Sequence, residues 1–368
     1  MAKKKVLILG NSHLVVFKFR GELIERLVSD GLDVTVCFPN GPFGEGKETS
    51  QKYGCKFVEN YIDRRGTNAL KDLLIIKDYI SIIRKVKPDV VLAYTVKPDV
   101  YGGIACRITG TPFLPNITGL GKGLDEGGIV QKLTIFLYKV AIKKAKCVFF
   151  QNEDDKAFFD NHQIKYLKAI ILPGSGVNIT KFNPIPYPTP DNPIRFIYVA
   201  RVMKAKGIEQ FFDAAHAIKK LYPTTEFHIC GYCEEDYKDV LDDKVKLGDV
   251  IYHGLVDNVK EFEKDCHAIV LPSFHPEGIS NVLLEGAAVL RPLITTDQAG
   301  CKPTVDDGVT GYIVKQKDSK DLIEKIITFI ELPYEVKKCM GEKGRKKIEQ
   351  QFNREIVVEK YMEEIGEV

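Results

Sequence analysis

The chain has 368 residues, of which 44% are hydrophobic and 28% charged, and its formal net charge is +3. That length suits two domains with separate cores, and the composition is typical of a folded globular chain, which excludes a disordered or low-complexity protein. Nine cysteines, an odd number scattered along the chain, argue against a disulfide framework.

Short apolar segments alternate with helical patterns through the first half of the chain. They predict strands at 6–9, 34–38, 57–59, 90–94, 113–116 and 148–150, and helices most clearly at 19–29, 70–85, 99–108 and 129–144. Such alternation predicts a parallel, doubly wound sheet that binds ligands beyond the carboxyl ends of its strands. We therefore expect a first α/β domain over 1–180.

Two loops at predicted strand ends are candidate binding sites. Gly10-Asn11-Ser12-His13 follows the first strand, but it lacks a dinucleotide fingerprint. We predict that Asn11 contacts one substrate, a group donor. We predict that His13 is a catalytic group that orients or deprotonates a hydroxyl of a second substrate, the acceptor. A hydrogen bond of His13 within the loop is the alternative. The glycine-rich loop 116–123 is explained either by close approach to a ligand or by a plain long turn.

The first half is also the more basic half, since Lys and Arg outnumber Asp and Glu before residue 190 and the reverse holds after it. The helical pattern at 129–146 combines five lysines with an apolar side that includes Leu133 and Phe136. Such a helix could rest against anionic lipid headgroups, or it could pack in the core with a solvated basic face. No recognition motif for nucleic acid occurs, so we do not expect that partner.

No stretch predicts a membrane span, because the most apolar candidate, 129–142, contains Lys132 and Lys139 and is shorter than the roughly 20 residues that a span needs. The N-terminus lacks an apolar region of signal-peptide length. We expect a cytoplasmic protein that can also lie peripherally at the inner face of the cell membrane.

The second half begins after a segment with five prolines, 178–193, which we interpret as an interdomain linker. The strand-helix alternation then repeats. It predicts strands at 196–199, 227–230, 250–252, 268–271, 293–295 and 312–314. A second doubly wound domain is therefore expected over 191–350.

Two cations follow the first strand of this second domain. Arg201 stands next to the strand end, and Lys206 follows five residues later, before Gly207 and a predicted helix. Arg offers a planar fork of donors and Lys a point charge, so the pair could clamp a diphosphate. Two solvated surface cations are the alternative.

Two carboxylates follow the strand at 268–271. Glu277 lies in a proline-bounded loop just before a helix predicted at 280–290, and Glu285 lies about two turns inside it. A helix N-terminus after a glycine-containing loop favours an anion. The spacing alone is not specific, because E-x7-E recurs elsewhere, for example at Glu226 and Glu234.

These residues resemble the donor half of the retaining GT-B glycosyltransferases of family 4. The shared pattern is a strand with A-R-x4-K-G, ending at Gly207, and then P-E-G-x-x-N-x-x-x-E, ending at Glu285. Segments 173–182 and 253–259 also match, whereas Thr310 replaces the Asn of the family's N-G turn. The resemblance covers essentially the whole chain. The first domain is similar to that of bacterial enzymes of capsule, O-antigen and oligosaccharide assembly.

The resemblance implies two Rossmann-like domains that face a cleft, with a final helix at 351–368 that packs back on the first domain. It implies that Arg201 and Lys206 neutralise a leaving diphosphate, and that Glu277 binds sugar hydroxyls or stabilises oxocarbenium-like charge. Glu285 would accept hydrogen bonds from ribose hydroxyls. The further donor contacts that we carry over are Gly278, Ile279, Ser280 and Asn281.

The resemblance also implies transfer of a hexose or N-acetylhexosamine, with retention, from a nucleotide-sugar, most often a UDP-sugar. The expected acceptor is a polyprenyl-diphosphate-linked or other saccharide. No cofactor and no metal are expected, since the chain contains no D-x-D. Two rival functions are a UDP-N-acetylglucosamine 2-epimerase of the same shape and a non-catalytic nucleotide-sugar-binding protein.

Overall fold

Strands and helices alternate along the chain and build two separate parallel sheets. The structure, a computed structural model, describes residues 3–40, 44–62, 69–125, 127–191, 193–234 and 237–368. Contacts divide the chain into unit 1, Met1–Ser175 with Arg354–Val368, and unit 2, Gly176–Asn353. The prediction of two doubly wound parallel sheets is confirmed.

The described strands of unit 1 form one parallel sheet in the order β3-β2-β1-β4-β5-β6-β7. Their bounds are β1 (Lys5–Leu9), β2 (Asp33–Phe38), β3 (Lys56–Glu59), β4 (Val90–Tyr94), β5 (Phe113–Ile117), β6 (Val148–Phe150) and β7 (Ala169–Ile171). The strand order reverses between β1 and β4, which is a topological switch point of the kind where open α/β sheets bind ligands.

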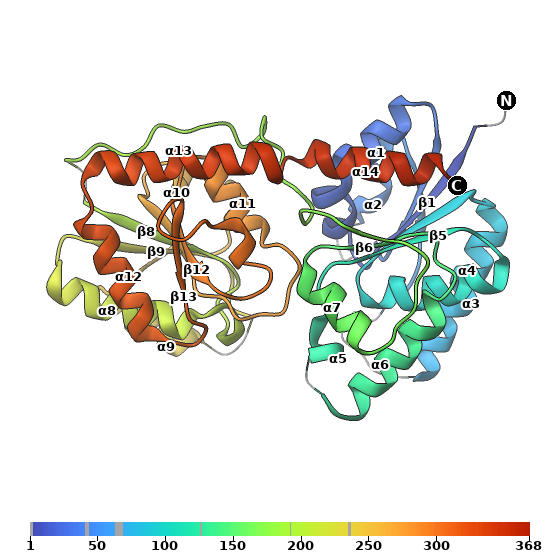
Figure 1. The fold of residues 1–368 in the computed structure, drawn as a ribbon, viewed down its shortest axis with the longest axis horizontal. Coiled ribbons are helices and arrows are strands. Elements are labelled where there is room, and N and C mark those ends of the chain that lie inside the picture. The colour runs from blue at the N-terminus through green and yellow to red at the C-terminus, as the bar shows by residue number, and fades with distance from the viewer. Residues whose placement is uncertain (1–2, 41–43, 63–68, 126, 192, 235–236) are drawn as a thin grey trace. The chain divides into compact units, whose positions relative to one another are not determined.

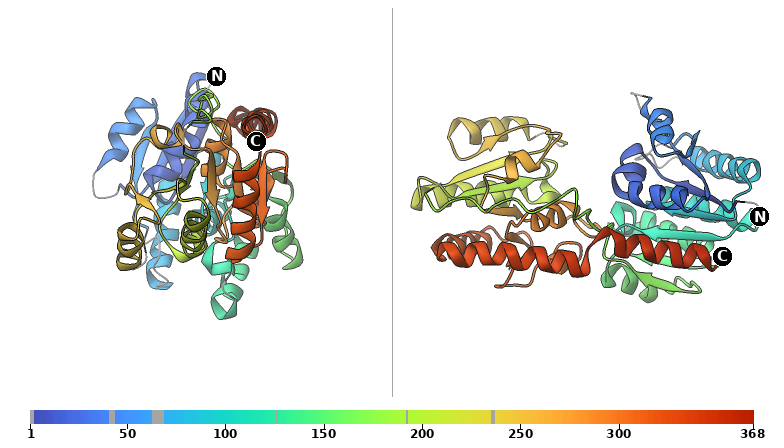
Figure 2. Two further views of the ribbon diagram at one scale, coloured as in Figure 1. Left: turned by 90° about the vertical axis from the view of Figure 1, so that its left-hand side faces the viewer. Right: turned by 90° about the horizontal axis from the view of Figure 1, so that it is seen from above.

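Helices cover both faces of this sheet (Figures 1 and 2). Their bounds are α1 (Phe19–Ser29), α2 (Glu45–Lys52), α3 (Ala69–Val86), α4 (Gly103–Thr109), α5 (Gly121–Asp125), α6 (Gly128–Ala141), α7 (Glu153–Asn161) and α14 (Arg354–Gly366). Two short π-helices, Leu14–Lys18 and Pro98–Gly102, precede α1 and α4. Helices α3, α4, α6 and α7 share one core with the sheet, and α1 and α14 share the other.

The last helix of the chain, α14, belongs to unit 1. Its Tyr361 is fully buried in the core of that unit, and Asn116 on β5 donates a hydrogen bond to the phenol. At its first turn, Arg354 donates to Glu22 at 2.8 Å and to the Ser175 carbonyl at 3.2 Å. These bonds fix the helix against α1, and the two helices lie side by side in Figure 1.

The described strands of unit 2 form a second parallel sheet in the order β10-β9-β8-β11-β12-β13. Their bounds are β8 (Arg195–Val199), β9 (Glu226–Cys230), β10 (Ile251–Tyr252), β11 (Ala268–Leu271), β12 (Leu293–Thr296) and β13 (Gly311–Val314). The helices are α8 (Ile208–Leu221), α9 (Lys238–Lys246), α10 (Lys260–Glu263), α11 (Asn281–Ala288), α12 (Ser319–Glu331) and α13 (Tyr334–Gln351).

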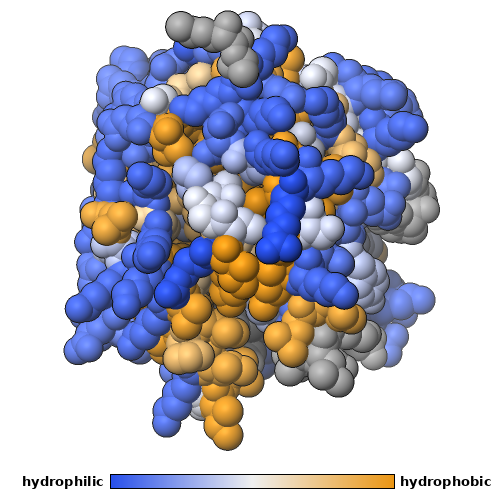
Figure 3. All heavy atoms as spheres, turned by 90° about the vertical axis from the view of Figure 1, so that its right-hand side faces the viewer, coloured by the Kyte–Doolittle hydropathy of each residue, from blue (hydrophilic) through white to orange (hydrophobic). Residues whose placement is uncertain are grey.

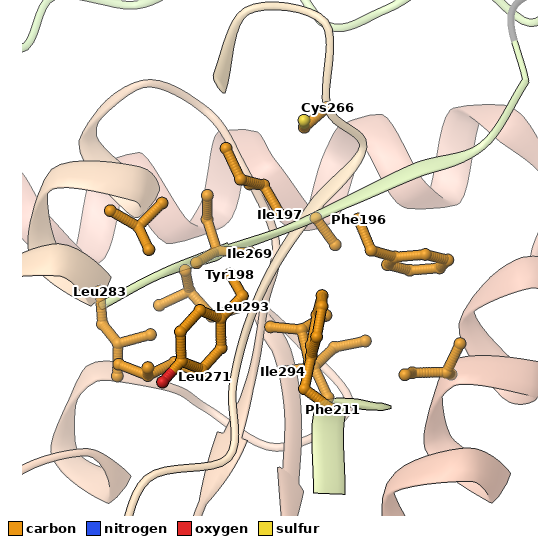
Figure 4. Close-up of a cluster of buried hydrophobic side chains, with 14 of the residues drawn as sticks. Phe196, Ile197, Tyr198, Phe211, Cys266, Ile269, Leu271, Leu283, Leu293 and Ile294 are labelled. Carbon is orange, nitrogen blue, oxygen red and sulfur yellow. The ribbon is translucent and has the colours of Figure 1, made fainter. Parts of the chain in front are cut away.

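The core of unit 2 centres on its three middle strands. Figure 4 shows side chains of β8, β11 and β12 packed with Phe211 of α8 and Leu283 of α11. These strands are apolar on consecutive positions because a parallel sheet with helices on both faces buries both sides of each strand. The site-bearing loops thus start from fully buried strands.

The proline-rich segment at 178–193 is not the free linker that its composition suggests. Arg345 of α13 donates to the Ile179 carbonyl at 3.1 Å, and the fully buried Arg291 donates to the Pro186 carbonyl at 3.0 Å. Proline excludes regular helix and central strand, but it leaves carbonyl groups that a guanidinium can bind. The described part of the segment is therefore fixed to unit 2.

Three other expectations differ from the structure. The helix predicted at 99–108 is divided into a π-helix and α4, and the helix predicted at 129–146 ends at Ala141. The helix predicted at 280–290 ends at Ala288, because Leu290 has a positive φ of 67° that an α-helix does not contain. Strand β7 was not expected, and its three residues are only partly buried.

Candidate functional site

The residues of unit 2 that we predict to bind the diphosphate and the sugar lie on loops after neighbouring strands. Arg201 and Lys206 follow β8, and Glu277 follows β11. Strand β8 pairs in parallel with both β9 and β11, so the loops after all three strands lie at one edge of the sheet. This is the edge at which a doubly wound sheet binds ligands.

Lys206 and Glu277 form a direct ion pair, with 2.6 Å between Nζ and Oε1. Only 9% of the lysine side chain is exposed, compared with 28% for the glutamate. A largely desolvated ammonium needs a charged partner, and removing either partner of such a pair is costly. The structure thus joins two of the predicted catalytic residues, although they are 71 positions apart.

Two glycines allow these loops to approach each other closely. Gly207 has φ +76°, and a Cβ there would lie 2.0 Å from the Pro272 carbonyl oxygen. A Cβ on Gly300 would lie 1.9 Å from the Gly278 carbonyl oxygen. Any side chain would therefore push the loop 272–280 away from the loops on either side of it.

The other predicted cation, Arg201, is bound through both its backbone carbonyl and its side chain. Its carbonyl accepts a hydrogen bond of 2.9 Å from the buried Tyr198 hydroxyl, and its guanidinium forms an ion pair with Glu234, which follows β9. One third of the Arg201 side chain remains exposed, against 12% for Glu234. Sequence reasoning missed Glu234, because only the order of the strands brings the end of β9 beside the end of β8.

The four residues that the family resemblance predicts to contact the donor lie in the loop 272–280 and at the start of α11. Ser280 precedes the helix, and its N–H already donates to the Gly300 carbonyl at 2.9 Å. Ile279 is buried in the core, and Gly278 lies against Gly300. Asn281 is the first helical residue, where the helix dipole favours negative charge.

The predicted ribose contact, Glu285, is a nearly buried residue of α11. Burial, and secondarily the negative charge of Glu285, raises the pKa of Glu263 at the end of α10 to about 8. The Glu263 carboxyl is 1% exposed, and neither of its oxygens has a hydrogen-bond partner among the described residues. Glu263 was not singled out in the sequence, since only the fold shows this burial.

The predicted residues of unit 1 lie after β1. The His13 ring accepts or donates a hydrogen bond with Thr49 Oγ1 at 3.0 Å, between Nε2 and the hydroxyl, and packs against Phe17 at 5.1 Å. The ring is therefore engaged with α2. The Oδ1 atom of Asn11 is buried and has no hydrogen-bond partner among the described residues. The two residues belong to a different unit from Arg201 and Lys206.

Helix α6 carries an apolar and basic surface, which we call the α6 surface. Ile129, Val130, Leu133 and Phe136 are between 53% and 86% exposed, whereas Tyr138 and Ala141 face the core. Exposed lysines occur on the helix and in the residues just after it. They are Lys132, Lys139, Lys143, Lys144 and Lys146. Hydrophobic side chains gather toward the lower edge of the face in Figure 3, where Figure 1 places α5 and α6.

Two features are absent from the described residues, a cluster of metal ligands and a membrane-spanning helix. No three His, Cys, Asp or Glu side chains among them are grouped as metal ligands would be. No helix in the described part of the chain is both long enough and apolar enough to cross a bilayer.

Comparison with known families gives two matches that follow the division into units. The model described as "Glycosyl transferases group 1" matches residues 180–347, and "Glycosyl transferase 4-like" matches residues 5–152. The capsular polysaccharide biosynthesis glycosyltransferase CapM of Staphylococcus aureus is 26% identical over 92% of this chain and 91% of its own.

A second relative is the N,N'-diacetylbacillosaminyl-diphospho-undecaprenol α-1,3-N-acetylgalactosaminyltransferase of Campylobacter jejuni. It is 23% identical to the chain, with 88% of each protein covered. Among solved structures, Anabaena HepE in complex with UDP and glucose matches 99% of this chain and 100% of its own, with a TM-score of 0.78 and 16% identity. The predicted GT-B fold is thereby confirmed.

Proposed function

Because the chain belongs to the group 1 glycosyl transferases, we propose that it transfers a hexose or N-acetylhexosamine from a UDP-sugar to a lipid-diphosphate-linked saccharide. The observation that carries this proposal is the convergence of Arg201, Lys206 and Glu277 at one edge of the unit 2 sheet. Two cations and a carboxylate there suit a diphosphate and the sugar attached to it.

In this proposal the leaving diphosphate is stabilised by protein charges. Arg201 offers a fork of N–H donors and Lys206 a nearly buried ammonium, so negative charge that develops on the diphosphate meets two fixed cations in a partly desolvated site. The N-terminus of α11 adds backbone dipoles. We propose that these groups serve in place of a metal ion.

Glu277 has two roles open to it, because it can hydrogen-bond sugar hydroxyls or stabilise positive charge at the anomeric carbon. Its ion pair with Lys206 keeps the carboxylate beside the diphosphate site in either case. We further propose that transfer retains the anomeric configuration and that Glu285 binds the ribose hydroxyls. Both of these steps rest on the family resemblance.

The acceptor is proposed from the relatives and from the surface of unit 1. The names of two relatives specify a diphospho-undecaprenol substrate, one from Campylobacter jejuni and one from Escherichia coli. The α6 surface combines exposed apolar side chains with lysines, which complements an anionic bilayer that presents such a lipid. We propose that this surface rests on the inner face of the membrane.

The test is a donor screen with purified protein. UDP-, GDP- and ADP-sugars are incubated with and without a lipid-linked saccharide acceptor, and both nucleotide release and the glycolipid product are followed. We expect acceptor-dependent release from a UDP-sugar that persists in EDTA, with an α-linked product from an α-linked donor. Arg201→Ala should lower the rate at least about 100-fold, as expected when a group that binds transition-state charge is lost.

The rival functions give different results in the same screen. Conversion of a UDP-sugar without acceptor and without free nucleotide indicates an epimerase. Tight UDP binding without turnover under every condition indicates a nucleotide-sugar-binding protein. Loss of activity in EDTA that Mg²⁺ restores would contradict the proposed role of the two cations.

A further inference from the structure

The loop that carries Glu277 is bound to the end of β12 and the residues after it. We call residues 295–301 the support segment. Its Thr295 hydroxyl donates to the carbonyl of the last residue of β11 at 2.7 Å, and its Thr296 hydroxyl donates to the Ser273 carbonyl. Both threonines are fully buried. The support segment therefore fixes the point at which the loop leaves the sheet.

One glycine of the support segment, Gly300, contacts the centre of the loop. Its carbonyl accepts a hydrogen bond of 2.9 Å from the Ser280 N–H. A Cβ on Gly300 would lie 1.9 Å from the Gly278 carbonyl oxygen and 2.6 Å from the Glu277 carbonyl oxygen. The backbone of Glu277 thus lies directly against Gly300, and a shift of Gly300 must shift Glu277.

Gln298 fixes Gly300 through its side chain. Its Oε1 atom accepts a hydrogen bond of 2.6 Å from the Gly300 N–H. Gln298 is only 7% exposed and Gly300 is buried, so loss of this acceptor leaves a buried N–H that costs about 1–3 kcal/mol unless the loop moves. The Gln298 carbonyl also accepts hydrogen bonds of 2.9 Å from the N–H groups of Cys301 and Lys302. Gln298 therefore closes the turn that contains Gly300.

The opposite side of the loop is bound to residues that follow β8. The Phe274 N–H donates to the Ala205 carbonyl at 2.9 Å, and the neighbouring Lys206 pairs with Glu277. The loop is buried at both ends and partly exposed at 274–277. Its fixed ends thus leave the segment with Glu277 open to a ligand.

Two constraints therefore set the position of the Glu277 carboxylate. One is the ion pair with Lys206, which is a point charge on a flexible stem and does not fix a direction. The other is the contact of the Glu277 backbone with Gly300. Hydrogen bonds to sugar hydroxyls depend on distance and angle, so a shift of about 1 Å in the carboxylate weakens them.

We propose that Gln298 is a positioning residue for the donor sugar, because it fixes Gly300, against which the Glu277 backbone lies. The proposal rests on the proposed function, in which Glu277 contacts that sugar. It predicts that Gln298 affects binding of the sugar and leaves binding of the nucleotide unchanged, since Arg201 of the diphosphate site is bound to Glu234.

The test compares the Kd for UDP with the Kd for a UDP-sugar, both measured by isothermal titration calorimetry. The wild type is first titrated with UDP-glucose, UDP-galactose, UDP-N-acetylglucosamine and UDP-N-acetylgalactosamine, and the one that binds most tightly is used for every variant. Gln298→Met removes the acceptor but keeps an unbranched side chain of similar length. Gln298→Glu keeps an acceptor oxygen at the same position.

Thr225→Val is the matched control. The Thr225 side chain is 3% exposed and donates to the Tyr222 carbonyl at 2.8 Å, just before β9 and so at the other edge of the sheet. The variant loses one buried hydrogen bond to the backbone, as Gln298→Met does, but at a place remote from the loop. It should lower the thermal unfolding temperature and change neither Kd.

We expect Gln298→Met to raise the Kd for the UDP-sugar about fivefold, the scale of one neutral hydrogen bond, with an unchanged Kd for UDP. Gln298→Glu should keep the wild-type ratio of the two Kd values. Equal weakening of UDP and UDP-sugar binding by Gln298→Met would overturn the proposal, as would no weakening of either, or the same loss in Gln298→Glu.

A second variant makes the same test if Gln298→Met does not fold. Gly300→Ala places a Cβ against the carbonyls of Glu277 and Gly278, so it should also weaken binding of the UDP-sugar and spare UDP. An equal effect of Gly300→Ala on both ligands would contradict the proposal.

These measurements need neither acceptor nor turnover, which separates the proposal from the proposed function. A selective loss of UDP-sugar binding supports the role of Gln298 even if the wild type transfers no sugar. Transfer by the wild type together with normal UDP-sugar binding by Gln298→Met contradicts that role alone. A wild type that binds UDP but none of the four UDP-sugars contradicts both.

Discussion

At the scale of single residues, the charges at the candidate donor site neutralise one another before any ligand is present. Lys206 is paired with Glu277, and Arg201 with Glu234. A diphosphate that binds Arg201 must therefore compete with the Glu234 carboxylate, and it must also approach a second negative charge. We therefore predict that Glu234 weakens the binding of a diphosphate at Arg201.

Glu234→Gln should lower the Kd for UDP about fivefold, because the variant removes the competing charge but keeps a side chain of the same shape. The matched control is Glu226→Gln at the start of β9, where the carboxylate pairs with Arg195 at 2.6 Å and not with the site. Isothermal titration of UDP measures both variants. Weaker UDP binding by Glu234→Gln would show that Glu234 supports Arg201 and does not compete for it.

Glu263 predicts a dependence of stability on pH. Its pKa is about 8 in the folded protein, compared with a usual value of 4.5. Between these values the folded state binds more protons than the unfolded state, so the free energy of unfolding falls as pH rises, by at most about 1.4 kcal/mol per pH unit. The stabilising contribution is complete below pH 4.5 and is lost as pH passes 8.

Glu263→Gln cannot titrate, so the variant should gain stability relative to the wild type as pH rises from 5 to 8. Urea unfolding at these two pH values measures the gain. Glu261→Gln, at a largely exposed position of the same helix, provides the control and should leave the pH dependence unchanged. An identical pH dependence in wild type and Glu263→Gln would mean that Glu263 does not hold its proton in the folded state.

At the scale of elements, α6 shows what an apolar pattern can and cannot predict. The pattern identified the helix and its lysines, but it left open whether the apolar side meets the core or the surroundings. Two apolar groups share the helix: Tyr138 and Ala141 are buried, and Leu133 and Phe136 are more than half exposed. Which group packs inside depends on the neighbours α4 and the π-helix 98–102, and these contacts are not encoded in the helix itself.

The α6 surface gives a prediction at this scale. Leu133→Asp with Phe136→Asp should reduce binding to vesicles that contain anionic lipid at least about tenfold, because two apolar contacts are lost and negative charge is added. Leu221→Asp with Leu247→Asp, at similarly exposed positions of unit 2, is the control and should bind as the wild type does. Flotation with anionic and neutral vesicles measures both pairs.

The result also distinguishes a bilayer from another copy of the chain as the partner of this surface. Equal flotation of both double variants would contradict the membrane contact. A change from dimer to monomer in the α6 variant, measured by light scattering without vesicles, would assign the surface to self-association. Donor turnover with a soluble acceptor should not change in either variant.

At the scale of the whole molecule, the sequence predicted the architecture well, because each strand of a parallel sheet is buried on both faces and forms an apolar run. Positions far apart in the chain were less predictable. The pairing of Arg201 with Glu234 depends on the order of β8 and β9, which no local pattern contains. The proline-rich segment was misassigned because composition predicts irregular backbone but not the arginines that bind it.

The burial of single polar residues was also hard to predict, because Tyr79 and Asp99 occur in segments whose pattern is dominated by apolar neighbours. The family resemblance predicted the donor residues because they follow a fixed motif. Residues that would bind an acceptor have no such motif, so the sequence offered His13 alone as a candidate.

The way the chain enters and leaves unit 2 has a practical consequence. The unit is a single continuous segment, Gly176–Asn353, and Val177 near its beginning forms a parallel bridge with Asn353 at its end. It is therefore an insertion between the two parts of unit 1, with adjoining ends. A gene fragment encoding 176–353 should yield a module that folds by itself, and a flexible peptide joining Ser175 to Arg354 should close unit 1 on its own.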